Sequence, residues 1–166
     1  MSYREAFVFG WSIAWRQALW TAAIGIPFGL VVAVVVNQTT PNTSMRDFAF
    51  SIGFYPVFAA MMLLVISPKA IRGAVAKAFS GFRVQASKGG VVSELSYSDS
   101  VQVSLLGMIV SMVLGGLYSL IEFPTVTMGL LVEAPLVLLV VYPAIAEAAV
   151  YVRYRGFRLV VLRGEA

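Results

Sequence analysis

The chain alternates between long apolar runs and short polar stretches. Four apolar runs cover residues 17–36, 48–66, 101–121 and 126–152. A helix needs about 20 apolar residues to cross the hydrocarbon core of a bilayer, and each run is close to or above that length. The pattern therefore predicts an all-α, polytopic membrane protein with four transmembrane helices, in which residues 1–166 form a single membrane domain.

The polar stretch between the second and third runs predicts a different kind of helix. Over residues 68–83 apolar side chains recur at steps of three and four, and basic side chains fall on the opposite side. Ser67 suits the N-cap and Pro68 the first helical position. We expect a basic amphipathic helix at the membrane interface, facing anionic headgroups or a partner through Lys69, Arg72, Lys77, Arg83 and, beyond its end, Lys88. The plainer alternative is a solvated loop whose charges only set the topology.

The distribution of charge predicts the orientation of the chain. The net charge is +4, and eleven of the twelve Lys and Arg residues lie in the amino end, the central loop and the tail. Arg46 alone lies in the two other loops. The positive-inside rule then places both termini in the cytoplasm, and we expect a bacterial or archaeal inner membrane. Because the basic residues adjoin apolar runs, nucleic acid is not an expected partner.

Two short motifs predict where helices begin. Ser2 and Glu5 have the spacing of a capping box, as do Ser96 and Asp99 ahead of the third run. The pair Gly89-Gly90 interrupts the helical periodicity between them.

Two stripes of small residues indicate close helix packing. In each stripe the small residue recurs every fourth position, which allows two helix backbones to approach. Spans one and three run in the same direction, so the stripes are expected to pack against one another, or one of them against a second subunit. The seam residues are Thr21, Gly25, Gly29 and Ala33 in the first stripe, and Gly107, Ser111, Gly115 and Ser119 in the second.

The fourth run contains two carboxyl groups, Glu133 and Glu147. They lie fourteen residues apart, which places them near one face of a helix. Acidic side chains inside a membrane are costly and are candidates for an ion pathway. The structural alternative is that Glu147 pairs with Arg16 or Arg153 and that Glu133 lies shallowly at the outer interface.

Four prolines lie inside the expected spans, and they predict bends. Pro27 and Pro56 fall in the first two spans, and Pro135 and Pro143 in the fourth. Each removes a backbone donor and leaves a carbonyl without its helical partner.

The chemistry that the chain lacks narrows the function. It contains neither Cys nor His, so disulfides, thiolate or imidazole metal sites and His-based nucleophiles are excluded, and no cofactor is expected. No catalytic or phosphate-binding motif is present, so we do not expect an enzyme. The sequence favours a noncatalytic integral-membrane subunit or scaffold of a larger complex, docking through the small-residue seams and the basic face. The alternative is a small oligomeric transporter or channel that uses Glu133 and Glu147.

Overall fold

The computed structural model describes the chain except for residues 40–41, 76, 122–128, 130–131, 134 and 165–166. Two long helical rods come first. The first rod consists of α1 (Tyr3–Trp20), a π-helical segment (Thr21–Gly25) and α2 (Ile26–Thr39). The second rod contains, in order, α3 (Thr43–Ala49), a π segment (Phe50–Phe54), α4 (Tyr55–Met61), a π segment (Met62–Ile66) and α5 (Ser67–Val75).

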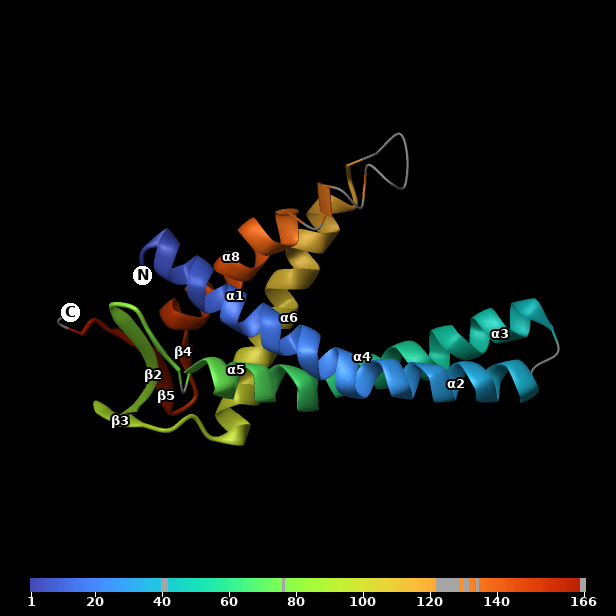
Figure 1. Cartoon of the computed structure of the whole chain (residues 1–166), viewed down its shortest axis with the longest axis horizontal. Helices are drawn as coiled ribbons and strands as arrows, with labels where there is room; N and C mark the ends of the chain where they lie inside the picture. The colour runs from blue at the N-terminus through green and yellow to red at the C-terminus, as the bar shows by residue number, and fades with distance from the viewer. Residues whose placement is uncertain (40–41, 76, 122–128, 130–131, 134, 165–166) are drawn as a thin grey trace.

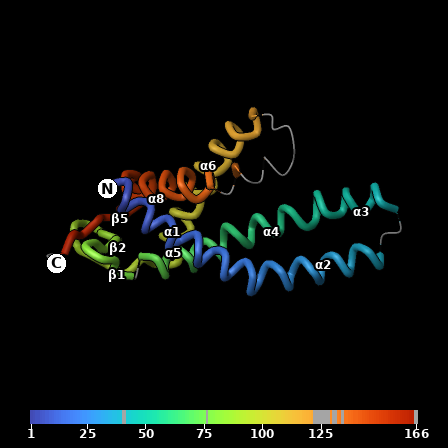
Figure 2. The backbone as a smooth tube through the Cα atoms, turned by 45° about the horizontal axis from the view of Figure 1, so that its top comes forward, coloured from blue at the N-terminus to red at the C-terminus, as the bar shows by residue number. Residues whose placement is uncertain are grey.

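The two rods form an antiparallel hairpin that projects from the rest of the molecule (Figures 1 and 2). We call residues 21–66 the hairpin arm. Its rings stack across the two rods, as Phe28 does on Phe54 at 5.8 Å between ring centroids. Its outer surface is apolar, with Leu30 63% and Phe48 66% exposed. Such a surface suits lipid rather than water.

A second arm diverges from the hairpin arm (Figure 1). It consists of α6 (Tyr97–Tyr118) and the returning π segment Val137–Val141, which continues into α8 (Tyr142–Tyr151). Among the described residues, three helices are long and apolar enough to cross a membrane, with lengths of 37, 33 and 22 residues. The expected fourth span is represented by the shorter apolar helix Val137–Tyr151, and part of its first half lies outside the described residues.

The main departure from the expected all-α fold is a five-stranded antiparallel sheet. Its strands are β1 (Ala78–Phe79), β2 (Phe82–Lys88), β3 (Val91–Ser93), β4 (Arg153–Tyr154) and β5 (Phe157–Leu162). The order is β1-β2-β5-β4, with β3 also paired to β2. In the central pairing Val84 lies opposite Val161 and Ala86 opposite Leu159, so the tail completes a sheet begun by the central loop.

The prediction of an amphipathic helix over residues 68–83 is therefore wrong beyond Val75. Ser67 does not begin a helix either, because α5 continues the second rod without a break. Phe82, the last apolar residue of that helical pattern, also begins a pattern with a period of two. On β2 Phe82, Val84 and Ala86 are buried while Arg83 is exposed. The turn between β2 and β3 needs two residues with positive φ, and Gly89-Gly90 supplies them at 57° and 90°.

One core joins the sheet to the helices. Side chains from α1, α5, α6, α8, β2 and β5 pack together in it, and we call this compact part the head. The largest fully buried members are Phe9, Val84, Val103 and Leu159. Helices α1 and α8 approach each other closely, since a Cβ on Gly10 would lie 2.7 Å from the Tyr142 carbonyl oxygen. Both chain ends lie at the head (Figure 1).

Each of four prolines follows a π-helical segment by two residues. The residue before Pro27 donates its N–H five positions back, from Ile26 to Thr21. The same i to i−5 bond precedes Pro56, Pro68 and Pro143. A proline ring clashes with the carbonyl four residues earlier, and widening the preceding turn relieves that clash. The predicted disturbances at residues 27, 56 and 143 are thus π turns.

The two predicted capping boxes are confirmed. The Ser2 hydroxyl accepts from the Glu5 N–H while the Glu5 carboxylate accepts from the Ser2 N–H. Ser96 and Asp99 form the same reciprocal pair at the start of α6. These caps fix where α1 and α6 leave the head.

Candidate functional site

An apolar cavity of about 460 Å³ lies where the two arms diverge from the head. One wall is α6, whose lining residues run from Val103 to Tyr118, about 22 Å along a helix at 1.5 Å per residue. The opposite wall includes Ala59 and Met62 of the hairpin arm, and α8 contributes Ile145. The cavity is long, narrow and mostly apolar.

A chain of polar side chains closes the head end of this cavity. The Tyr142 hydroxyl donates to the Gln17 side-chain oxygen at 2.8 Å, and the Gln17 amide donates to the Ser67 hydroxyl at 2.8 Å. These two bonds tie α8, α1 and α5 together at one level. Because each donor has an acceptor, the network satisfies polar groups that would be costly beside an apolar cavity.

The two candidate carboxyls occupy different environments. Glu133 lines the cavity, as does Tyr118, whose hydroxyl donates to the Gly129 carbonyl at 2.8 Å. Glu147 does not line it, and its side chain is exposed on α8, close to the head. The structure therefore does not bring the two carboxyls together in one cavity.

The suggested pairing of Glu147 with Arg16 or Arg153 is not found among the described residues. Their ion pairs are Lys88 with Asp99 and Arg163 with Glu5. Arg16 instead donates to the Ser12 carbonyl at 3.0 Å and to the Ser12 hydroxyl. The Arg16 guanidinium packs against Gly73, where an added Cβ would lie 2.8 Å from Arg16 Nε.

The first small-residue seam faces span two, not span three. A Cβ on Gly25 would lie 3.1 Å from the Phe58 ring, and one on Gly29 would lie 3.8 Å from the Phe54 ring. Thr21 donates to the Met62 sulfur at 3.7 Å. The expected pairing of the two seams is therefore wrong. The first seam packs against span two, which follows span one in the chain and folds back along it as a hairpin.

The second seam is only partly covered. A Cβ on Gly107 would lie 3.3 Å from Ile145 of α8, but one on Gly115 would meet nothing within 4 Å among the described residues. Gly107, Ser111 and Gly115 all line the cavity. Ser119 lies just past the end of α6, where its hydroxyl donates to the Gly116 carbonyl at 2.7 Å.

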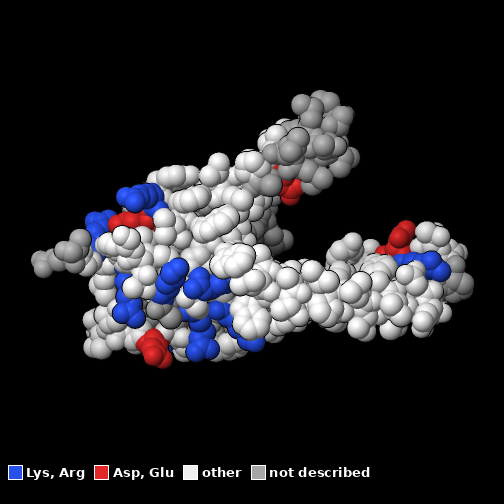
Figure 3. Space-filling model, in the orientation of Figure 1, with Lys and Arg blue, Asp and Glu red and all other residues white. Residues whose placement is uncertain are grey.

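The five predicted basic side chains lie on two elements and the segment between them. Lys69 and Arg72 are on α5, Arg83 and Lys88 are on β2, and Lys77 lies between them. Lys88 is paired to Asp99 at 2.8 Å. Figure 3 shows Lys and Arg side chains gathered on one face of the head.

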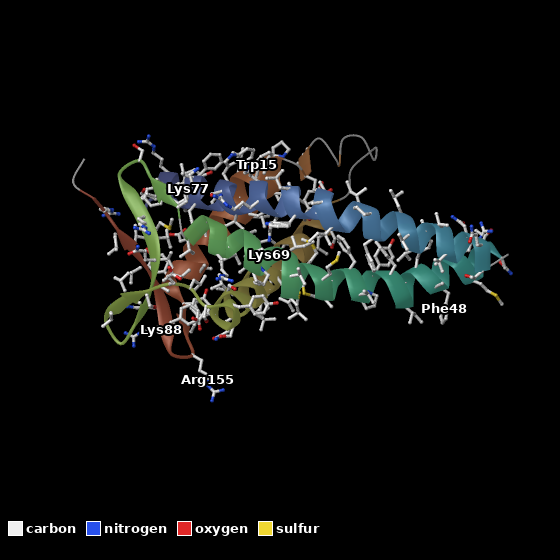
Figure 4. The ribbon with its side chains drawn as sticks, turned by 60° about the horizontal axis from the view of Figure 1, so that its bottom comes forward. Trp15, Phe48, Lys69, Lys77, Lys88 and Arg155 are labelled. Carbon is white, nitrogen blue, oxygen red and sulfur yellow. The ribbon has the colours of Figure 1, made fainter. Side chains whose placement is uncertain are left out.

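A groove of about 680 Å³ on that face brings three of these cations together. Lys69, Arg72 and Arg83 line it, together with Trp20 and Glu94. The Lys69 ammonium lies 4.4 Å from the Trp20 ring centroid, within range of a cation–π contact. Figure 4 shows Lys69 where α5 meets the hairpin arm and Phe48 at the far end of that arm.

Arg83 is oriented by its neighbour on the same strand. When the oxygen and nitrogen of the Gln85 side-chain amide are exchanged, the amide oxygen faces Arg83 and accepts a hydrogen bond from Arg83 Nε at 2.9 Å. Sequence periodicity could not reveal this groove, since one wall is a helix and the other is a sheet that the helical interpretation concealed.

The amino end is tied to the tail by a bidentate ion pair. Arg163 Nε lies 3.0 Å and Nη2 3.2 Å from the two carboxylate oxygens of Glu5. Glu5 precedes the apolar run 17–36 by three helical turns. The hydrogen bonds from Arg163 and from the Ser2 N–H lower the pKa of Glu5 to about 2.

The described residues hold no group of three or more His, Cys, Asp or Glu side chains that suits a metal ion. Their main concave features are the apolar cavity along α6, the basic groove beside Trp20, and a third groove lined by Arg153, Arg158 and Arg163. Comparison with protein-family models, with curated proteins and with solved structures finds no match to this chain.

Proposed function

We propose that this protein is a noncatalytic subunit of a larger membrane protein complex. Its arms lie in the bilayer, its head and both termini lie on the cytoplasmic side, and a transmembrane helix of another subunit packs along α6. The observation that carries this proposal is the cavity between the arms, with the uncovered Gly115 on its wall.

The shape and chemistry of the cavity support a helical occupant. Helices associate in lipid through close packing over small residues, and Gly107, Ser111 and Gly115 present such a surface over two helical turns. A cavity of about 460 Å³ cannot hold a whole helix, but it can receive the side chains along one helix face. The partner's backbone would then lie against Gly115.

The charge pattern supports the orientation. The hairpin arm has no charged residue in its apolar stretches 17–36 and 48–66, which at 20 and 19 residues match a core about 30 Å thick. The cations of the head lie at one end of that arm, and Arg46 lies at the other. This is the arrangement that the positive-inside rule describes.

The transporter alternative has one observation in its favour. Glu133 lines the cavity, and an acidic side chain facing a cavity within a membrane is a candidate for proton or cation binding. Glu147 does not share that position. A pathway would therefore depend on Glu133 alone within one protomer.

A single introduced cysteine tests the docking proposal, because the natural chain contains none. Gly115→Cys places a thiol on the cavity wall, and Gly53→Cys places one on the hairpin arm, where a Cβ also meets nothing within 4 Å. In membranes of the source cells we expect a short thiol-to-amine or photoactivated cross-linker to join Gly115→Cys to one defined protein, and Gly53→Cys to give no such product. The proposal fails if both variants remain uncross-linked and the tagged protein isolates as a monomer.

A further inference from the structure

The basic groove on the head combines three features that bear on what it binds. Its cations come from two elements, since Lys69 and Arg72 lie on α5 and Arg83 lies on β2. The ion pairs among described residues involve Lys88 and Arg163, so none of the three is neutralised by a described carboxylate. All three side chains are exposed.

The groove has an excess of two positive charges. Three cations line it, and Glu94, exposed on the segment after β3, offsets one of them. Two of the cations are guanidinium groups, which bind phosphate oxygens through paired N–H donors. A ligand with two negative charges on phosphate groups would balance this excess.

The position of the groove identifies the source of the phosphate. Trp20 lies three residues inside the start of the apolar run 17–36, and Lys69 lies three residues beyond the end of the run 48–66. Their contact therefore marks the head end of the apolar arm. Trp side chains favour the headgroup level of a bilayer, and Lys and Arg near that level attract anionic lipids. A lipid whose acyl chains lie against the hairpin arm would have its headgroup at Lys69.

We propose that this groove binds the headgroup of a doubly charged phospholipid, with Arg72 and Arg83 holding phosphate oxygens and Lys69, oriented over Trp20, completing the charge balance. The proposal rests on the membrane orientation given above but not on the presence of a partner subunit. A lipid-binding measurement on the purified protein therefore separates it from the docking proposal.

The test measures lipid adducts by native mass spectrometry of the detergent-solubilised protein. The probes are cardiolipin with two phosphodiesters, phosphatidylglycerol with one, zwitterionic phosphatidylcholine, and water-soluble glycerol 3-phosphate. We expect the affinity order cardiolipin, phosphatidylglycerol, phosphatidylcholine, and no displacement of cardiolipin by millimolar glycerol 3-phosphate. Equal affinity for cardiolipin and phosphatidylcholine, or displacement by glycerol 3-phosphate, would overturn the proposal.

Matched triple variants locate the site. Lys69→Gln/Arg72→Gln/Arg83→Gln removes the three cations of the groove, and Arg153→Gln/Arg155→Gln/Arg158→Gln removes three exposed cations elsewhere on the head. We expect the first variant to weaken cardiolipin binding by about fivefold for each cation lost, and the second to leave it within about twofold. A thermal melt of each variant without lipid confirms folding. The reverse result, with binding lost only in the second variant, would place the lipid on β4 and β5 instead.

Trp20→Leu provides an independent check. It removes the ring beneath Lys69 but keeps all three cations, so cardiolipin binding should weaken two- to fivefold through loss of the cation–π contact. Trp11→Leu, at a tryptophan that does not line the groove, is the control and should bind like the natural protein.

Discussion

The Tyr3 hydroxyl donates a hydrogen bond of 2.7 Å to the Leu139 carbonyl, linking the first residue of α1 to the π segment before α8. Pro143 lies four residues after Leu139 and has no N–H to offer that carbonyl. A tyrosine from another helix thus fills the acceptor that the proline leaves open.

The same relationship occurs a second time. The Tyr97 hydroxyl donates to the Leu64 carbonyl, and Pro68 lies four residues after Leu64. Tyr97 is the first residue of α6, as Tyr3 is of α1. Each of these two prolines therefore leaves one carbonyl of its own helix without a backbone donor. The tyrosine at the start of another helix donates to that carbonyl and so attaches the two helices to each other.

We predict that Tyr3→Phe lowers the free energy of unfolding by about 1 kcal/mol, because it removes one hydrogen bond and leaves a carbonyl without a partner. Tyr55→Phe is the control, since Tyr55 is similarly exposed on the hairpin arm. Thermal melts of the detergent-solubilised variants measure the difference. Equal melting of both variants would show that the Leu139 carbonyl finds another donor at no cost.

The contact between α1 and α8 gives a second prediction. Gly10→Ala places a methyl group 2.7 Å from the Tyr142 carbonyl oxygen, and backbone cannot move aside as a side chain can. We expect a loss of about 1–3 kcal/mol in the free energy of unfolding. Gly116→Ala, where a Cβ meets nothing within 4 Å, should be neutral or slightly stabilising because Ala favours helix. Chemical denaturation of both variants in one detergent measures the contrast.

The sequence was sufficient to predict features governed by local pattern. Of the four spans that the apolar runs predicted, three correspond to described helices of membrane-spanning length. The spacings Ser2 to Glu5 and Ser96 to Asp99 predicted two helix starts that the structure contains. Capping depends on residues three apart, so it can be recognised without knowledge of the fold.

The sheet was missed because its pairing is not local. Phe82 fits both the helical pattern before it and the alternating pattern after it, and the strand that decides between them, Phe157–Leu162, lies about 75 residues later. On β5 Phe157 and Leu159 are buried and Arg158 is exposed, which is the alternation typical of a strand. Considered together with Gly81, Gly89-Gly90 and Gly156, that alternation was the available signal for hairpins.

The candidate sites were predicted only in part, because their residues come together through contacts that are not local in the sequence. The basic residues were identified, but only the sheet places Arg83 beside α5, and only the hairpin directs Gly25 toward Phe58. A stripe of small residues indicates that a helix face packs closely, without indicating which neighbour it meets.

The pair Glu5–Arg163 predicts how stability changes with pH. The pKa of Glu5 is lowered from 4.5 to about 2 in the folded protein, so folding favours the ionised carboxylate. The stabilisation is complete above the unfolded pKa and is lost as pH falls from about 4.5 towards 2. Because Arg163 is largely exposed, screening by water keeps the contribution of the pair to stability small.

Melting of the natural protein and Glu5→Gln between pH 7 and pH 3 tests this expectation. The natural protein should melt higher at pH 7, and the difference should shrink as the pH falls below 4.5. A gap that persists unchanged at pH 3 would contradict the assigned role of the ion pair.

Glu147→Gln is predicted to change the free energy of unfolding by no more than about 0.5 kcal/mol. Its carboxyl is exposed near the head and has no ion pair among the described residues, and Arg16 is held by Ser12 instead. The pairing of Glu147 with Arg16 or Arg153, which the sequence suggested, does not fit this geometry. A large loss of stability in thermal melts would mean that Glu147 has a partner in the assembled complex or in the undescribed residues.

Glu133→Gln separates a docking subunit from a transporter. Glu133 lines the cavity that we assign to a partner helix, so its neutralisation should leave proton permeability unchanged when the protein is reconstituted in liposomes under a pH gradient. If the cavity instead conducts protons or cations, the natural protein will dissipate the gradient and Glu133→Gln will not, because the carboxyl must change its charge or exchange its ion during transport. Glu147→Gln serves as the matched control, with the same change of charge outside the cavity. The docking function would be rejected in favour of transport by three results together. Flux would be lost in Glu133→Gln, it would be retained in Glu147→Gln, and both variants would melt like the natural protein.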